Sequence, residues 1–228
     1  MRHPLAYGAT AAHRKRLSAV ALVAVLSSGA AVWAEPVTIA ALGDSLTQGY
    51  GLPEGDGFVP KMDQWLQDHG AEAIILNAGV SGDTTAGGLS RLGWTLTPDV
   101  DAMIVFLGGN DMLRGLDPAT SRANLDAILS EVQTRNLPVL LIGLPAAGNY
   151  GATFKSDFDA IYPELAAKYG TLLVPDFFAA LQAQPGGTAA IRQRYFQADG
   201  IHPNPDGVTL IVDQIGPEVA KLIELAQD

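Results

Sequence analysis

The sequence predicts an α/β fold, in which helices cover both faces of a parallel sheet. Short β-branched or aliphatic runs alternate with longer amphipathic stretches, which is the pattern of such a sheet. No repeat, low-complexity tract or interdomain linker interrupts this alternation. We therefore expect one doubly wound domain.

The predicted strands are five short apolar runs, at residues 37–42, 73–77, 102–107, 138–143 and 171–175. The predicted helices between them lie around residues 58–69, 84–92, 118–135 and 154–169. A final helix follows, because apolar residues recur at spacings of three and four: Val208, Ile211, Ile215, Val219, Leu222 and Ala226. Asn204 supplies its N-cap, and Pro205 suits the first helical position.

Residues 1–34 are predicted to be a signal peptide, which leaves residues 35–228 as the folding unit. A basic stretch at 13–16 precedes an apolar run at 17–32. The run ends in a pattern typical of a signal-peptidase site, which predicts cleavage after Ala34. The alternative is an uncleaved membrane anchor. We favour the signal peptide because residues 27–29 interrupt a run shorter than the ~20 residues of a membrane span. The protein is then exported, to the periplasm or the medium.

Charge and composition exclude several classes of protein. Four of the 14 basic residues and none of the 24 acidic ones lie in residues 1–34, so ten basic residues face 24 acidic ones in the remainder. This excess of negative charge disfavours nucleic acid and anionic membrane surfaces as partners. The absence of cysteine excludes disulfides, thiolate metal sites and a cysteine nucleophile. We expect a small-molecule substrate, and we favour a monomer while leaving the oligomeric state open.

Chemically active residues follow the predicted strands. Residues 43–45 follow the first strand, 81–83 lie just past the second and 108–111 follow the third, while 199–202 precede the last helix. Because ligands of such folds bind in the crevice outside the carboxyl ends of the strands, we expect these segments to meet there.

Ser45 and His202 are the candidate nucleophile and base. Outside the leader the chain has two histidines, and His69 is explained by its place at a helix C-terminus. A serine hydroxyl needs a base to take its proton and a carboxylate to orient that base, and Asp199 precedes His202 by three residues. On this segment alone, a surface turn explains His202 equally well. Asp44 and Asp111 are expected to hold loops by hydrogen bonds to backbone amides.

Three donors are candidates for an oxyanion hole: the backbone N–H of Ser45, the backbone N–H of Gly82 and the side-chain amide of Asn110. They follow three different strands, and such donors stabilise the negative oxygen of a tetrahedral intermediate. Each of the last two has an alternative explanation, since Gly82 also suits a turn and Asn110 also suits a helix cap.

These motifs together resemble those of the GDSL or SGNH hydrolases. The order is Gly43-Asp44-Ser45-Leu46, then Gly82, then Gly109-Asn110-Asp111, then Asp199-x-x-His202, over nearly all of residues 37–228. The longer segments around them look most like the branch of periplasmic thioesterases, lysophospholipases and arylesterases. The resemblance implies a flavodoxin-like three-layer sandwich with a five-stranded parallel sheet and no metal or cofactor. It also implies Ser45 as nucleophile, His202 as base, Asp199 as its orienting acid, and Gly82 and Asn110 in the oxyanion hole.

We therefore expect a serine esterase that cleaves small to medium acyl esters, with thioesters and lysophospholipids as further candidate substrates. The segment at residues 144–151 is longer than in that branch and is expected to line the acyl side, so chain-length preference does not carry over. Two alternatives stay open: a carbohydrate O-deacetylase of the same superfamily and a non-catalytic flavodoxin-like binding module. A metal hydrolase is the least favoured, because the chain offers few strong ligands.

Overall fold

A single all-parallel sheet organises residues 36–228, the part of the chain that the computed structural model describes. Its strands lie in the order β2-β1-β3-β4-β5, which is the order of flavodoxin-like folds, and Ile39 pairs with both Ile75 and Ala102. The bounds are β1 (Val37–Gly43), β2 (Ala73–Gly79), β3 (Ala102–Phe106), β4 (Val139–Ile142) and β5 (Leu172–Val174). The five predicted strands are confirmed. The predicted signal peptide lies outside the described residues.

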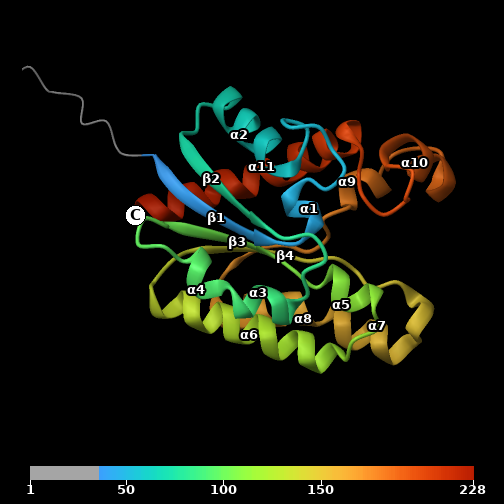
Figure 1. Cartoon of the computed structure of the whole chain (residues 1–228), viewed down its shortest axis with the longest axis horizontal. Helices are drawn as coiled ribbons and strands as arrows, with labels where there is room; N and C mark the ends of the chain where they lie inside the picture. Colours follow the sequence, from blue (N-terminus) through green and yellow to red (C-terminus); the bar gives the residue numbers. More distant parts are fainter. Residues whose placement is uncertain (1–35) are drawn as a thin grey trace, which may run out of the picture. The chain divides into compact units, whose positions relative to one another are not determined.

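Helices cover both faces of the sheet, so the three-layer sandwich is also confirmed (Figure 1). One face carries α2 (Phe58–Asp68) and α11 (Pro205–Gln227). The other carries α3 (Thr85–Ser90), α4 (Leu92–Thr95), α6 (Pro118–Thr134) and α8 (Ile161–Tyr169). Within residues 36–228, no helix has both the length and the hydropathy needed to cross a membrane.

The core lies on both sides of the central strands. Every residue of β3 and β4 is buried, whereas the edge strand β2 leaves Ile74 and Leu76 exposed. The largest fully buried side chains include Phe58 of α2 and Phe106 of β3. Each buried large side chain contributes about 1.5–3 kcal/mol, so the strand ends that carry polar loops are anchored in a rigid interior.

The last helix begins as the sequence predicts. The Asn204 side chain accepts a hydrogen bond from the Gly207 amide at 3.0 Å, and Pro205 occupies the first helical position. The predicted apolar face is buried from Val208 to Leu222. This fixed start matters because the segment at 199–202 directly precedes it.

The structure differs from the predicted helices in two places. The stretch expected as one helix at 154–169 is divided into α7 (Ala152–Asp159) and α8, because Pro163 has no N–H to donate to the carbonyl of Asp159. The stretch at 84–92 becomes α3 and α4, with Arg91 between them.

Several short elements have no counterpart in the prediction, because they are too short to show a periodic pattern. They are α1 (Ser45–Gln48), α5 (Gly109–Leu113), the 3₁₀ helix η1 (Gly148–Tyr150), α9 (Ala179–Gln182) and α10 (Gly187–Tyr195).

Gly216 tests the packing of α11 against α2. A Cβ at this position would lie 2.5 Å from the indole of Trp65, so we expect Gly216→Ala to destabilise the fold by about 1–3 kcal/mol. Gly93→Ala on α4 is the control, because a Cβ there meets nothing within 4 Å and alanine favours the helix. Urea unfolding of both variants measures the difference, and equal stability would contradict this packing.

Candidate active site

Ser45 lies at a sharp corner between β1 and α1. Asp44 caps the short helix, and its carboxylate accepts a hydrogen bond from the Leu46 amide at 3.0 Å. A Cβ at Gly43 would collide with the Thr47 side chain, while the φ of Gly43 is not positive. The corner therefore requires glycine for space rather than for backbone freedom. It holds the largely buried Ser45 at the carboxyl edge of the sheet.

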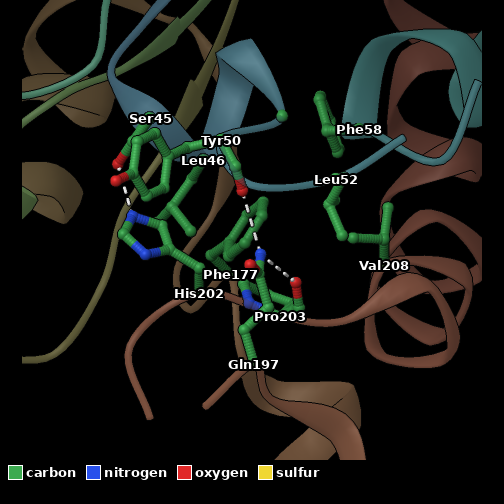
Figure 2. Close-up of a pocket in the computed structure, with 11 residues that line it drawn as sticks. Ser45, Leu46, Tyr50, Leu52, Phe58, Phe177, Gln197, His202, Pro203 and Val208 are labelled. Carbon is green, nitrogen blue, oxygen red and sulfur yellow. Dashed lines mark hydrogen bonds between the residues drawn. The ribbon is translucent and has the colours of Figure 1, made fainter. Parts of the chain in front are cut away.

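His202 joins Ser45 to Asp199. Its Nε2 lies 2.8 Å from the Ser45 Oγ, and its Nδ1 lies 2.6 Å from the Asp199 Oδ2. Figure 2 shows the imidazole pointing at the hydroxyl. The structure therefore brings together the three residues that the sequence suggests, in the hydrogen-bonded order that nucleophilic catalysis requires.

The Asp199 carboxylate is held by three donors from its own turn. Besides the imidazole, it accepts hydrogen bonds from the backbone amides of Ile201 at 2.9 Å and His202 at 3.0 Å. Desolvation raises the pKa of Asp199, but these hydrogen bonds outweigh it and lower the pKa to about 2. The carboxylate therefore stays ionised and can stabilise a proton on the imidazole.

The two remaining predicted residues border the same pocket as Ser45 and His202. This site pocket has a volume of about 410 Å³, and its lining includes Gly82 and Asn110. Gly82 has a φ of 82°, which favours glycine, and its carbonyl accepts a hydrogen bond from Arg114 at 2.8 Å. The N-cap of α5 is Gly108, so Asn110 does not cap that helix. Its side-chain amide donates to the Asp44 carboxylate at 3.1 Å.

A model of one hydrolase family matches most of this architecture. It is described as the GDSL-like lipase/acylhydrolase family and matches residues 41–210, which span β1 to the first turns of α11. The chain belongs to this family.

Individual members of the family are similar over most of their length. The chain is 35% identical to esterase TesA of Pseudomonas aeruginosa, with 82% of this chain and 89% of the relative covered. It is 34% identical to thioesterase 1/protease 1/lysophospholipase L1 of Escherichia coli, with coverages of 82% and 85%. The crystal structure of AlinE4, an SGNH-hydrolase family esterase, is 46% identical with a TM-score of 0.67, covering 82% of this chain and 97% of that one.

Asp44, the aspartate of the GDSL motif, is buried next to Ser45. Desolvation by burial raises its pKa to about 6, although hydrogen bonds from Leu46 and Asn110 and the nearby His202 oppose that shift. Asp44 and Asp111 both hold loops by hydrogen bonds to amides, as expected. Asp111 is buried and accepts from the Thr85 amide at 2.9 Å and from the Ser121 hydroxyl at 2.9 Å.

Arg91 fastens two of the strand ends that carry the GDSL motifs. Its guanidinium donates to the carbonyl of Gly43 at 2.8 Å and to the carbonyl of Ala78 at 2.7 Å, and it pairs with Asp83 at 2.6 Å. One side chain therefore links the ends of β1 and β2 to the segment that follows Gly82. Arg91 is not recognisable from the sequence, because these contacts join residues up to 48 positions apart.

Gln197 fastens the loop after α1 to the loop that carries His202. Its side-chain amide donates to the carbonyl of Tyr50 at 2.9 Å and to the carbonyl of Pro203 at 3.0 Å (Figure 2). The Tyr50 ring lies near the imidazole, with centroids 4.9 Å apart. Neither Gln197 nor Tyr50 is recognisable from the sequence, since the hydrogen bond between them spans 147 positions and leaves no local pattern.

His69 stays away from the site, as the sequence predicts. It caps the C-terminus of α2, where its ring stacks on Trp65 and its Nδ1 lies 2.7 Å from the Trp65 carbonyl. In residues 36–228, no group of three or more His, Cys, Asp or Glu side chains is arranged to hold a metal ion.

Asp44 gives a test of the electrostatics around the nucleophile. Because its pKa is raised from 3.8 to about 6, its contribution to stability is full below pH ~4 and is lost as the pH rises through ~6. Asp44→Asn lacks this dependence. We expect the unfolding free energy of the variant, relative to wild type, to increase by about 2 kcal/mol between pH 4 and pH 7 in urea titrations.

Asp99→Asn supplies the contrast for that experiment. A hydrogen bond from the Thr97 side chain lowers the pKa of Asp99, so the pH dependence of this exposed variant should have the opposite sign. A difference between wild type and Asp44→Asn that stays constant with pH would contradict the shifted pKa of Asp44.

Proposed function

We propose that this protein hydrolyses carboxylic esters through an acyl-serine intermediate, with Ser45 as nucleophile, His202 as base and Asp199 as the acid that orients it. The observation that carries the proposal is the unbroken hydrogen-bonded chain from the Ser45 hydroxyl through the imidazole to the Asp199 carboxylate. Membership of the acylhydrolase family supports an enzyme over a non-catalytic binding module.

In the first step His202 Nε2 takes the proton of Ser45 as the hydroxyl oxygen attacks the acyl carbonyl carbon. Ionised Asp199 stabilises the imidazolium, which then donates the proton to the departing alcohol or thiol. In the second step the same imidazole takes a proton from water as the water oxygen attacks the acyl carbon. The imidazolium then returns this proton to the Ser45 Oγ as the bond between that oxygen and the acyl carbon breaks and the carboxylic acid leaves. The tight contacts at both imidazole nitrogens fix the ring for these transfers, since each lies at hydrogen-bond distance from its partner.

The oxyanion of each tetrahedral intermediate is assigned to Ser45 N–H, Gly82 N–H and the Asn110 amide. Within residues 36–228, neither of the two backbone amides donates a hydrogen bond to another protein group, so both remain available. Asp44 accepts one hydrogen of the Asn110 amide and leaves the second for substrate. One donor of this kind contributes about 3–4 kcal/mol to transition-state stabilisation.

Small and medium acyl esters are the proposed substrates, with acyl thioesters and lysophospholipids as further candidates. The two names that support this range are those of the esterase and of the thioesterase/lysophospholipase to which the chain is similar. We also propose that residues 1–34 direct export as a signal peptide and that residues 35–228 form the hydrolase domain.

Ser45→Ala tests the assigned nucleophile. We expect the variant to lose at least about a thousandfold in kcat for p-nitrophenyl acetate and to escape labelling by a fluorophosphonate, because no hydroxyl remains to form the acyl-enzyme. Ser90→Ala on α3 is the control and keeps both activity and label. Hydrolysis by Ser45→Ala at the wild-type rate would end the proposal.

Gln197→Ala tests whether the loop of the nucleophile must be fastened to the loop of the base. Without its two hydrogen bonds, the loops that carry Ser45 and His202 are free to move apart. We therefore expect kcat to fall about tenfold while KM changes little. Gln193→Ala is the control, since Gln193 is exposed on α10. Unchanged kcat in a folded Gln197→Ala protein would show that the loops hold their positions without this link.

A further inference from the structure

A second pocket adjoins the site pocket and is large enough to hold one arm of a substrate. This side pocket has a volume of about 660 Å³. It shares five lining residues with the site pocket: Met112, Leu113, Leu144, Phe178 and Ile201. Because the two pockets meet at these apolar side chains, the side pocket lies within reach of one arm of an ester whose carbonyl is placed at Ser45.

The wall of the side pocket changes character away from Ser45. The shared residues are apolar, whereas the part formed by α9, α10 and the segment between them carries Gln182, Gln184 and Thr188. Arg192 of α10 is the one charged residue among the described residues that line it. None of the described residues that line this pocket carries a carboxylate, although the chain has 24 acidic residues.

Arg192 is also unusual among the cations of this acidic protein. Of the ten Lys and Arg residues in the described part, four lysines and three arginines pair with carboxylates. Arg114 donates to the Gly82 carbonyl, and Arg194 lies over the Tyr195 ring. Within residues 36–228, Arg192 alone has no carboxylate, hydrogen-bond acceptor or aromatic ring as a partner for its guanidinium.

The position of Arg192 ties it to the loop of the catalytic base. Its side chain packs over Gly200, where a Cβ would lie 3.2 Å from the Arg192 Cδ. Gly200 stands between Asp199 and His202, and it has a φ of 66°. The stem of Arg192 therefore lies against the loop that holds the imidazole, and Arg192 is also one of the residues that line the side pocket.

We propose that Arg192 binds an anionic group, a carboxylate or a phosphate, at the far end of one arm of the ester substrate. The proposal rests on the proposed function, because it takes Ser45 as the reacting centre. A guanidinium presents planar N–H donors that match either anion, and its charge offsets the repulsion of the surrounding acidic protein. An ester with such an end is then preferred over a neutral ester of equal length.

Paired substrates test this preference on each arm of the ester. For the acyl arm, the p-nitrophenyl monoester of adipic acid is compared with its neutral methyl ester. For the alcohol arm, 1-octanoylglycerol 3-phosphate is compared with 1-octanoylglycerol. We expect wild type to favour the anionic member of one pair about 3- to 10-fold in kcat/KM, the size of a charge interaction that stays partly in water. The pair that shows the preference identifies the arm.

Charge reversal assigns the preference to one side chain. Arg192→Glu should invert the ratio of kcat/KM for the anionic and neutral substrates, and Arg192→Gln should bring it close to one. Arg194→Glu places the same charge change two residues along α10, outside the pocket lining, and should leave the ratio unchanged. Equal ratios for wild type and Arg192→Glu in both pairs, or an equal effect of Arg194→Glu, would overturn the proposal.

Binding without turnover separates this inference from the proposed function. Calorimetry with Ser45→Ala protein compares adipate with hexanoate, and we expect tighter binding of adipate that Arg192→Glu abolishes. Equal binding of the two acids would refute the role of Arg192. Failure of wild type to hydrolyse any of the four esters would instead refute the proposed function and leave the binding result to decide on Arg192.

Discussion

The candidate active site depends on one hydrogen bond between side chains that are 157 residues apart, from the Ser45 hydroxyl to the His202 imidazole. The hydroxyl is fixed by the corner after β1, and the imidazole by the loop that enters α11. Their separation therefore depends on how α11 packs over the sheet. Since β2 and β3 flank β1, the amides of Gly82 and Asn110 arrive at the same edge by the same packing.

The loops around this hydrogen bond are held by charged groups that the core partly or wholly buries. Asp44 lowers the stability of the fold at neutral pH, because burial opposes the ionisation of its carboxyl group. In return, its hydrogen bonds orient Asn110 and cap α1. Arg91 and Asp111 connect other strand ends in a similar way. Burial of such groups costs stability, so what they contribute is the geometry of the loops that they connect.

The sequence predicts the parts of this structure that leave a local pattern. The strands are recognisable because the buried ones are continuous apolar runs, and α11 because its face repeats and its cap is explicit. Ser45, Asp199 and His202 are predictable because the chemistry needs all three and few histidines are present. Gln197 and Arg91 are not, since each acts through carbonyls distant in sequence. The division between α7 and α8 is predictable from the sequence, because Pro163 lacks the N–H that a continuous helix needs at that position.

His202 and Asp199 belong to a single turn of four residues, whereas Ser45 stands on a separate element. Any loosening between these two elements separates hydroxyl from imidazole before it disturbs the imidazole and its aspartate. Under the proposed mechanism, mild heating or dilute denaturant would then leave a molecule that is still folded and keeps the contact between His202 and Asp199, yet does not hydrolyse esters. Loss of turnover in such a molecule precedes unfolding, and it reverses as soon as the two loops meet again.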